Sequence, residues 1–232
     1  MDYNRFWLPP DSGLFWTGAD GDLFWGNVAI TLPTNVGVAK ARFLLRGNTQ
    51  LFESPLSRST QTLELTGARW EATFELPPMN RAEAAVWIAW LTEQLGMAGR
   101  FFAGDPSMKT PRGVATGAPV VGATNQAGRI LATAGWTPNV TGILKAGDFF
   151  SYNTPTMWRQ MHQVITDADS DSGGVAVLEI VPSMRELPPI NTPITVSSPT
   201  CIMRLATDEM PAWDIESALI YGISFSGIEV FK

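Results

Sequence analysis

The sequence has few of the residues on which most enzyme and metal sites depend. Its 232 residues include one cysteine, Cys201, and one histidine, His162. A single cysteine cannot form a disulfide within the chain, and catalytic triads and zinc sites need several placed partners. The GxSxG, HExxH and phosphate-binding glycine motifs are absent as well. We therefore expect no catalytic residue, cofactor or metal site, and we predict that the protein is not an enzyme.

Charge is also scarce. Asp, Glu, Lys and Arg make up 16% of the chain, the net charge is −6, and the densest cationic stretch holds only Lys40, Arg42 and Arg46. Tracking a nucleic-acid backbone needs many more cations, so we expect no nucleic-acid partner. A weakly charged surface suits a protein that its neighbours cover, although a compact β-rich domain has the same composition.

Long apolar runs and a targeting pattern are missing too. The longest apolar run, residues 84–91, is too short to cross a bilayer. The first residues lack the basic and then apolar pattern of a secretory signal. We expect no membrane insertion, and assembly in the cytoplasm.

The most informative segment present is residues 69–106. Trp70, Ala72, Phe74 and Leu76 alternate with polar residues, which predicts a half-buried strand that ends at Pro77 and Pro78. A helix over about 80–95 follows, with Asn80 as N-cap, Glu83 completing a capping box, and Gly96 placed to end it in the left-handed conformation. Its apolar face is predicted to contain Ala84, Trp87, Leu91 and Leu95. Residues 98–103 predict another strand.

Further alternating segments predict strands at 28–33, 36–46 and 61–76, and in the second half at 143–144, 148–152, 158–166 and 174–181. Residues 107–140 hold mostly small residues and predict a connection between domains. The last segment, 215–231, alternates again and should pair with the first domain. We therefore predict a mainly β (α+β) fold. Residues 1–106 plus 206–232 form a strand-rich domain with one helix, and 107–205 form an inserted small β-barrel or β-sandwich.

Three Phe-Trp pairs recur at nine-residue spacing near the start of the chain. They are Phe6, Trp7, Phe15, Trp16, Phe24 and Trp25. Six large aromatics in a turn-rich segment cannot form a core alone. They either cover the main sheet or make a contact between subunits.

Several residues could in principle form a metal or catalytic site, but an ordinary structural role explains each of them better. Asp167, Asp169 and Asp171 begin a calcium-loop pattern that lacks its glycine and its final glutamate, so a turn between strands explains them better. Glu71 and Glu75 lie on the outer face of a strand, where nothing predicts a raised pKa. We expect His162 to make an ordinary hydrogen bond in a strand, and Cys201 to be an inert, partly buried thiol.

The segments FELPPMNRAEAAVWIAWL, GRFFAGDP, TPRGVA, LKAGDFFSY and VLEIVPSMRELPP, in this order, resemble distal tail and tail-tip proteins of long-tailed, siphovirus-like bacteriophages. The resemblance spans roughly residues 63–205. It implies a structural virion protein without cofactor or catalysis, in a homohexameric ring at the distal end of the tail tube. The implied partners are the chain itself, the tail tube protein and the tail hub or tip protein, and the implied location is the virion tail.

Tryptophans support two further expectations, one about the ring contact and one about an alternative function. Trp87 and Trp90 lie close together on one helix and are not expected to face one narrow core stripe together, so we predict that the first domain uses this helix in the ring contact. The alternative function is a carbohydrate-binding β-module, because nine tryptophans could supply stacking platforms for sugars.

Overall fold

The computed structural model describes residues 29–154, 159–209, 213–215 and 221–230. Within these ranges seven strands form one sheet, in the order β1-β6-β13-β15-β5-β2, with β14 beside β15. Their bounds are β1 (Ile30–Thr31), β2 (Lys40–Arg46), β5 (Arg69–Glu75), β6 (Phe101–Ala103), β13 (Cys201–Leu205), β14 (Trp213–Ile215) and β15 (Tyr221–Glu229). All neighbours are antiparallel except β1 and β6, which run parallel.

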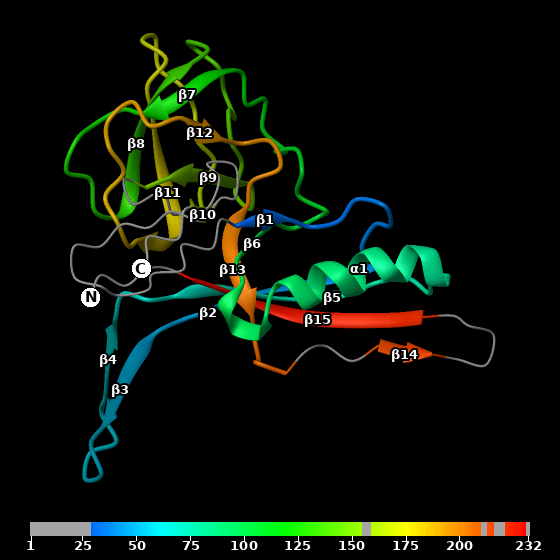
Figure 1. The fold of residues 1–232 in the computed structure, drawn as a ribbon. Helices are drawn as coiled ribbons and strands as arrows, with labels where there is room; N and C mark the ends of the chain where they lie inside the picture. Colours follow the sequence, from blue (N-terminus) through cyan, green and yellow to red (C-terminus); the bar gives the residue numbers. More distant parts are fainter. Residues whose placement is uncertain (1–28, 155–158, 210–212, 216–220, 231–232) are drawn as a thin grey trace, which may run out of the picture.

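A second sheet lies above the first in Figure 1, and among the described residues it has six strands in the order β12-β9-β10-β11-β8-β7. The bounds are β7 (Gly117–Val121), β8 (Gly128–Trp136), β9 (Phe149–Asn153), β10 (Arg159–Val164), β11 (Ala176–Met184) and β12 (Ile194–Thr195). The sheet nearly closes on itself, because Val121 exchanges backbone hydrogen bonds of 2.9 Å with Asn191 and Thr192 beside β12. The predicted fold class, mainly β with one helix and a small barrel, is confirmed.

The described ranges contain one α-helix, α1 (Arg81–Glu93), followed by the 3-10 turn η1 (Gly96–Ala98). The predicted capping box is present: the Asn80 side chain accepts from the Ala82 and Glu83 amides at 2.9 and 3.1 Å, and Glu83 accepts from the Asn80 amide at 3.1 Å. The left-handed reversal begins one residue before Gly96, at Leu95. Leu95 is 75% exposed, so its predicted place on the apolar face is wrong.

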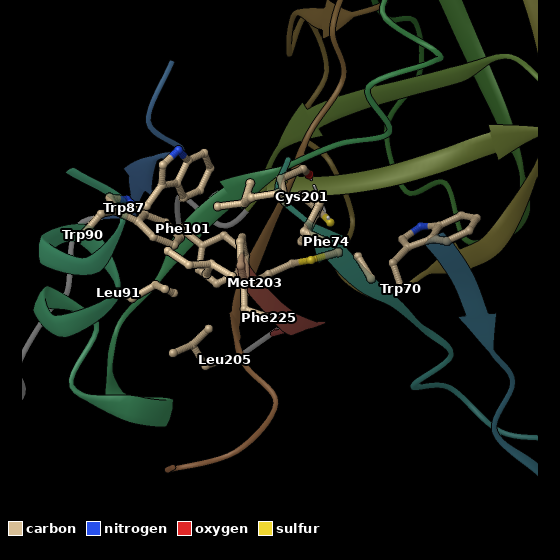
Figure 2. Packing of buried hydrophobic residues seen from close by; sticks show 14 of the residues in the cluster. Trp70, Phe74, Trp87, Trp90, Leu91, Phe101, Cys201, Met203, Leu205 and Phe225 are labelled. Carbon is tan, nitrogen blue, oxygen red and sulfur yellow. Dashed lines mark hydrogen bonds between the residues drawn. The ribbon is translucent and has the colours of Figure 1, made fainter. Parts of the chain in front are cut away.

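Helix α1 covers one face of the seven-stranded sheet and forms its core (Figure 2). Every second residue of β5 is buried, namely Trp70, Ala72 and Phe74. Phe225 of β15 lies 5.0 Å from the Phe74 ring and 6.0 Å from the Trp87 ring. The alternation that predicted a half-buried strand therefore reflects a sheet covered on one side.

Several predicted elements differ from the structure. Residues 61–76 form two strands, β4 (Thr60–Glu64) and β5, because the chain turns at Gly67, whose φ of 116° favours glycine. Residues 107–140, which were predicted to be a connection, contain β7 and β8. Many residues of these two strands are Gly or Ala, which do not indicate a strand. Residues 143–144 form only an isolated bridge, Leu144 to Ala168.

The two sheets follow the predicted division of the chain except at β13. Every strand of the six-stranded sheet lies between residues 117 and 195, within the predicted insertion. Strand β13, which the prediction assigned to the insertion, pairs with β6 and β15 in the seven-stranded sheet. The predicted pairing of the last segment with the first domain occurs as β15 beside β5. The division into two domains itself stays a prediction.

Polar and apolar contacts connect the two sheets. The Trp70 indole N–H donates to the Met161 carbonyl of β10 at 2.9 Å, and its ring lies 5.4 Å from Phe149. Just after β11, the Arg185 guanidinium pairs with the Glu229 carboxylate of β15. Both side chains are almost fully buried, with exposures of 8% and 0%. The two sheets therefore meet at a buried boundary and not at a solvated one.

Candidate assembly interface

A two-stranded hairpin projects away from both sheets (Figure 1). It consists of β3 (Thr49–Glu53) and β4 (Thr60–Glu64), and every one of its ten strand residues is exposed. The turn at its tip is closed by hydrogen bonds of 2.9 Å between Ser54 and Ser59 and between Arg58 and Ser54. A two-stranded sheet without further packing is only marginally stable in water.

The hairpin carries exposed apolar side chains on both faces and at its tip. Residues opposite each other in an antiparallel pair share a face. The register pairs Phe52 with Gln61 and Gln50 with Leu63, so Phe52 and Leu63 are diagonal neighbours on one face, and Leu51 lies on the other. These three side chains are 58–65% exposed, and Leu56 at the tip is 97% exposed. Such grouping of exposed apolar residues is typical of interaction sites.

The base of the hairpin is held in place. The Asn48 carbonyl accepts from the Leu65 amide at 2.8 Å, and the Asn48 side chain donates to the Thr66 carbonyl at 2.8 Å. Both carboxylate oxygens of Glu64 accept from Arg129 of β8 at 2.7 Å. These hydrogen bonds fix the orientation of the hairpin relative to the rest of the protein. Its apolar tip and faces are not covered by the described chain.

The strands predicted from alternation leave out β3 and merge β4 with β5. A signal was present, because the segments TQLFE (49–53) and TQTLE (60–64) both begin with Thr-Gln, end with Glu, and flank a Ser-rich turn. Alternation alone could not find this hairpin, since neither face of it is buried and the period-2 signal depends on one-sided burial.

The expectation that Trp87 and Trp90 cannot both face the core is wrong. Trp87 is fully buried, Trp90 is 7% exposed, and their rings contact each other at 5.9 Å. The buried residues of α1, from Ala84 to Leu91, span an arc of about 120° at 100° per residue, which is wider than the narrow stripe assumed. Both indoles thus belong to the core of the described chain, and a role for them in an interface stays a prediction. The six residues of the Phe-Trp pairs lie outside the described residues.

His162 and Cys201 are buried, structural groups. The His162 ring lies 2.7 Å from the Pro182 carbonyl through Nδ1 and 3.2 Å from the Tyr152 hydroxyl through Nε2. Because a carbonyl only accepts, Nδ1 carries the proton and Nε2 accepts from Tyr152. Burial lowers the pKa of His162 to about 3, so the ring is neutral. Burial likewise raises the pKa of the Cys201 thiol, which makes it unreactive.

The acidic residues serve as hydrogen-bond acceptors and ion-pair partners. Asp167, Asp169 and Asp171 lie in the loop between β10 and β11, as predicted, and each accepts from different backbone amides, at 2.6–2.8 Å. Glu71 pairs with Arg46 at 2.5 and 2.8 Å, and this hydrogen bonding lowers the pKa of its carboxyl group. Glu75 pairs with Lys40 at 2.9 Å. A general acid needs the opposite shift, a raised pKa.

The described ranges contain neither a metal-binding cluster nor a membrane-spanning helix. No group of three or more His, Cys, Asp or Glu side chains there is arranged to hold a metal ion. No helix within those ranges is long and apolar enough to span a membrane. In comparisons with known proteins, no protein-family model matches the chain, and no curated protein shows significant similarity to it. The exposed hairpin is therefore the feature of the described chain that most needs a functional explanation.

Proposed function

We propose that this chain is a structural virion protein that forms a homo-oligomeric ring at the distal end of a phage tail tube and joins the tube to the tip or baseplate hub. The observation that carries the self-association is the β3–β4 hairpin, which has four exposed apolar side chains and pairs with no other strand of the described chain. The resemblance of residues 63–205 to distal tail proteins supplies the tail location and the six copies. Neither catalysis nor a cofactor is part of the proposal.

A ring fits the kind of surface that the hairpin makes. A projecting arm can seat in a recess on another part of an identical chain. Such a contact is heterologous, and it closes into a ring when the rotation between neighbours allows closure. The tail tube and hub proteins would then contact the two rims of the ring.

The carbohydrate-binding alternative receives no support from the described side chains. Trp70, Trp87, Trp90 and Trp136 are all buried, with exposures of 0–7%. A stacking platform for a sugar needs an aromatic ring open to solvent. Of the large hydrophobic side chains that are exposed in the described ranges, Phe52 of the hairpin is the sole aromatic one.

The oligomeric state of the purified full chain tests the proposal. Mass photometry and light scattering should show a species near 151 kDa, which is six times 25.2 kDa, and negative-stain images should show rings. A chain that remains at 25.2 kDa at high concentration contradicts ring formation. Immunogold labelling of virions that contain the protein should mark the distal end of the tail, and label elsewhere contradicts the location.

A matched pair of variants connects the ring to the hairpin. Phe52→Ser with Leu63→Ser should shift the protein to monomers with unchanged circular dichroism, because these side chains contribute nothing to either core. Ile130→Ser is the control, since Ile130 is a 52% exposed apolar residue of β8 in the other sheet. Equal loss of assembly in both variants would show that general surface hydrophobicity, and not the hairpin, drives association.

A further inference from the structure

An open groove lies on the outer side of helix α1. Its volume is about 700 Å³, within the ~300–1,000 Å³ typical of binding clefts. The groove is lined by residues 31–34 and by Ala85, Val86, Ala89, Trp90 and Glu93 of the helix. Ala85 and Ala89 are small enough to let another backbone approach the helix closely, and Val86 is 47% exposed. The helix thus presents a mainly apolar lining.

The groove is held open by hydrogen bonds at both of its ends. The Trp90 indole N–H donates to the Thr31 carbonyl at 2.9 Å, which fixes the start of the 31–34 segment. The Asn35 side chain donates to the Glu83 carbonyl at 3.1 Å, which ties the far end of the same segment to the first turn of the helix. Because both ends are fastened, the segment cannot slide along the helix to fill the space between them.

The tip of the hairpin complements this groove in chemistry. Leu56, the most exposed of the large apolar side chains, lies two residues from Arg58 in the tight turn. Glu93 is the charged residue among those that line the groove. Neither Arg58 nor Glu93 forms an ion pair with another residue in the part of the chain that the structure describes.

In the view of Figure 1 the hairpin lies at the lower left and helix α1 lies toward the right. A single chain therefore presents the arm on one side and the recess on the other. This is the arrangement that a head-to-tail contact between identical copies requires.

We propose that the hairpin tip of one copy seats in the α1 groove of the next copy. Leu56 then packs against Ala85, Val86 and Ala89, and Arg58 pairs with Glu93. This inference rests on the proposed ring and names the contact that closes it. Leu56 supplies the apolar anchor, and the charge pair sets the orientation of the tip.

Disulfide trapping tests the contact directly. The variant Leu56→Cys with Val86→Cys should form, under mild oxidation, a ladder of covalent oligomers that ends at a closed ring. The control Leu56→Cys with Ser224→Cys places the second thiol on the uncovered face of the seven-stranded sheet, and it should stay uncrosslinked. The native Cys201 is buried and does not interfere. Equal ladders in both variants, or none with Val86→Cys, overturn the proposal.

Charge reversal tests the orientation of the tip. Arg58→Glu places two carboxylates at the contact and should raise the concentration for half-assembly at least about tenfold. Glu93→Arg should do the same, and the double variant Arg58→Glu with Glu93→Arg should return assembly close to the native level. Failure of the double variant to recover, while the native chain still forms rings, overturns the groove contact and leaves the proposed function standing. A native chain that stays monomeric overturns both.

Another occupant of the groove would be detected in the same experiment. Residues 1–28, with their Phe-Trp pairs, directly precede the segment that forms one wall. Deletion of these residues should leave the Leu56→Cys with Val86→Cys ladder unchanged. A ladder that forms only after the deletion would show that the N-terminal segment fills the groove, and it would overturn the proposal.

Discussion

The buried ion pair between Arg185 and Glu229 should contribute more to stability than any other polar contact between the two sheets. Its carboxylate has no exposed side-chain surface, and it also accepts from the Trp70 amide at 2.9 Å. The variant Glu229→Gln keeps the size and an acceptor oxygen but leaves the guanidinium without its counter-charge. Removing one partner of a buried pair costs about 3–5 kcal/mol, because the remaining charge stays away from water.

The measurements are urea denaturation and thermal unfolding of the native chain and the variant. For a chain of this length, 1 kcal/mol corresponds to about 2–4 °C, so the melting temperature should fall by about 6–20 °C. Glu75→Gln removes half of the exposed Lys40 pair and should cost below about 1 kcal/mol. A neutral pair, Arg185→Met with Glu229→Gln, should recover at least half of the loss. A loss in Glu229→Gln no larger than in Glu75→Gln would refute the reasoning.

Three further predictions follow from the buried and capping groups. Because the pKa of His162 is about 3 in the folded chain and 6.5 when free, only the unfolded chain gains this proton as pH falls below 6.5, and stability should drop by about 2.3 kcal/mol between pH 6.5 and 4.5. Denaturation at both pH values checks this against His162→Gln; an equal drop in the variant rules it out. Asn80→Ala should cost about 1 kcal/mol and Asn80→Asp much less, measured by thermal unfolding, because only the alanine lacks the capping oxygen. A thiol reagent should label Cys201 only in denaturant, and rapid labelling of the native chain would contradict its burial.

Local patterns predicted those elements whose burial is one-sided. Strand β5 and helix α1 were found because Trp70, Ala72 and Phe74 alternate and because Asn80 and Glu83 form a capping box that depends on neighbours in sequence. The hairpin was missed because its residues are exposed on both faces and leave no periodic signal. Strands β7 and β8 were missed because many of their residues are Gly or Ala, which indicate loops as readily as strands.

Local patterns also failed to predict which residues of α1 face outward. The sequence pointed to the tryptophans of α1 as an outward contact, whereas both lie inside. The reason is geometric, since a helix on a sheet covers an arc wide enough for Ala84, Trp87, Leu91 and Trp90 together. What faces outward on the same helix is the row of small residues Ala85, Val86 and Ala89, which composition alone gives no reason to notice.

By itself, the sequence determined the mainly β class, helix α1 with its cap, and the ordinary roles of His162 and Cys201. These depend on local spacing and on the scarcity of reactive residues, which no fold can change. The tertiary structure alone decided which strands pair, that Arg185 meets Glu229 across 44 residues, and that an apolar arm and an apolar groove lie far apart on one chain. Such long-range relations follow from how sheets pack and close, and no window of sequence contains them.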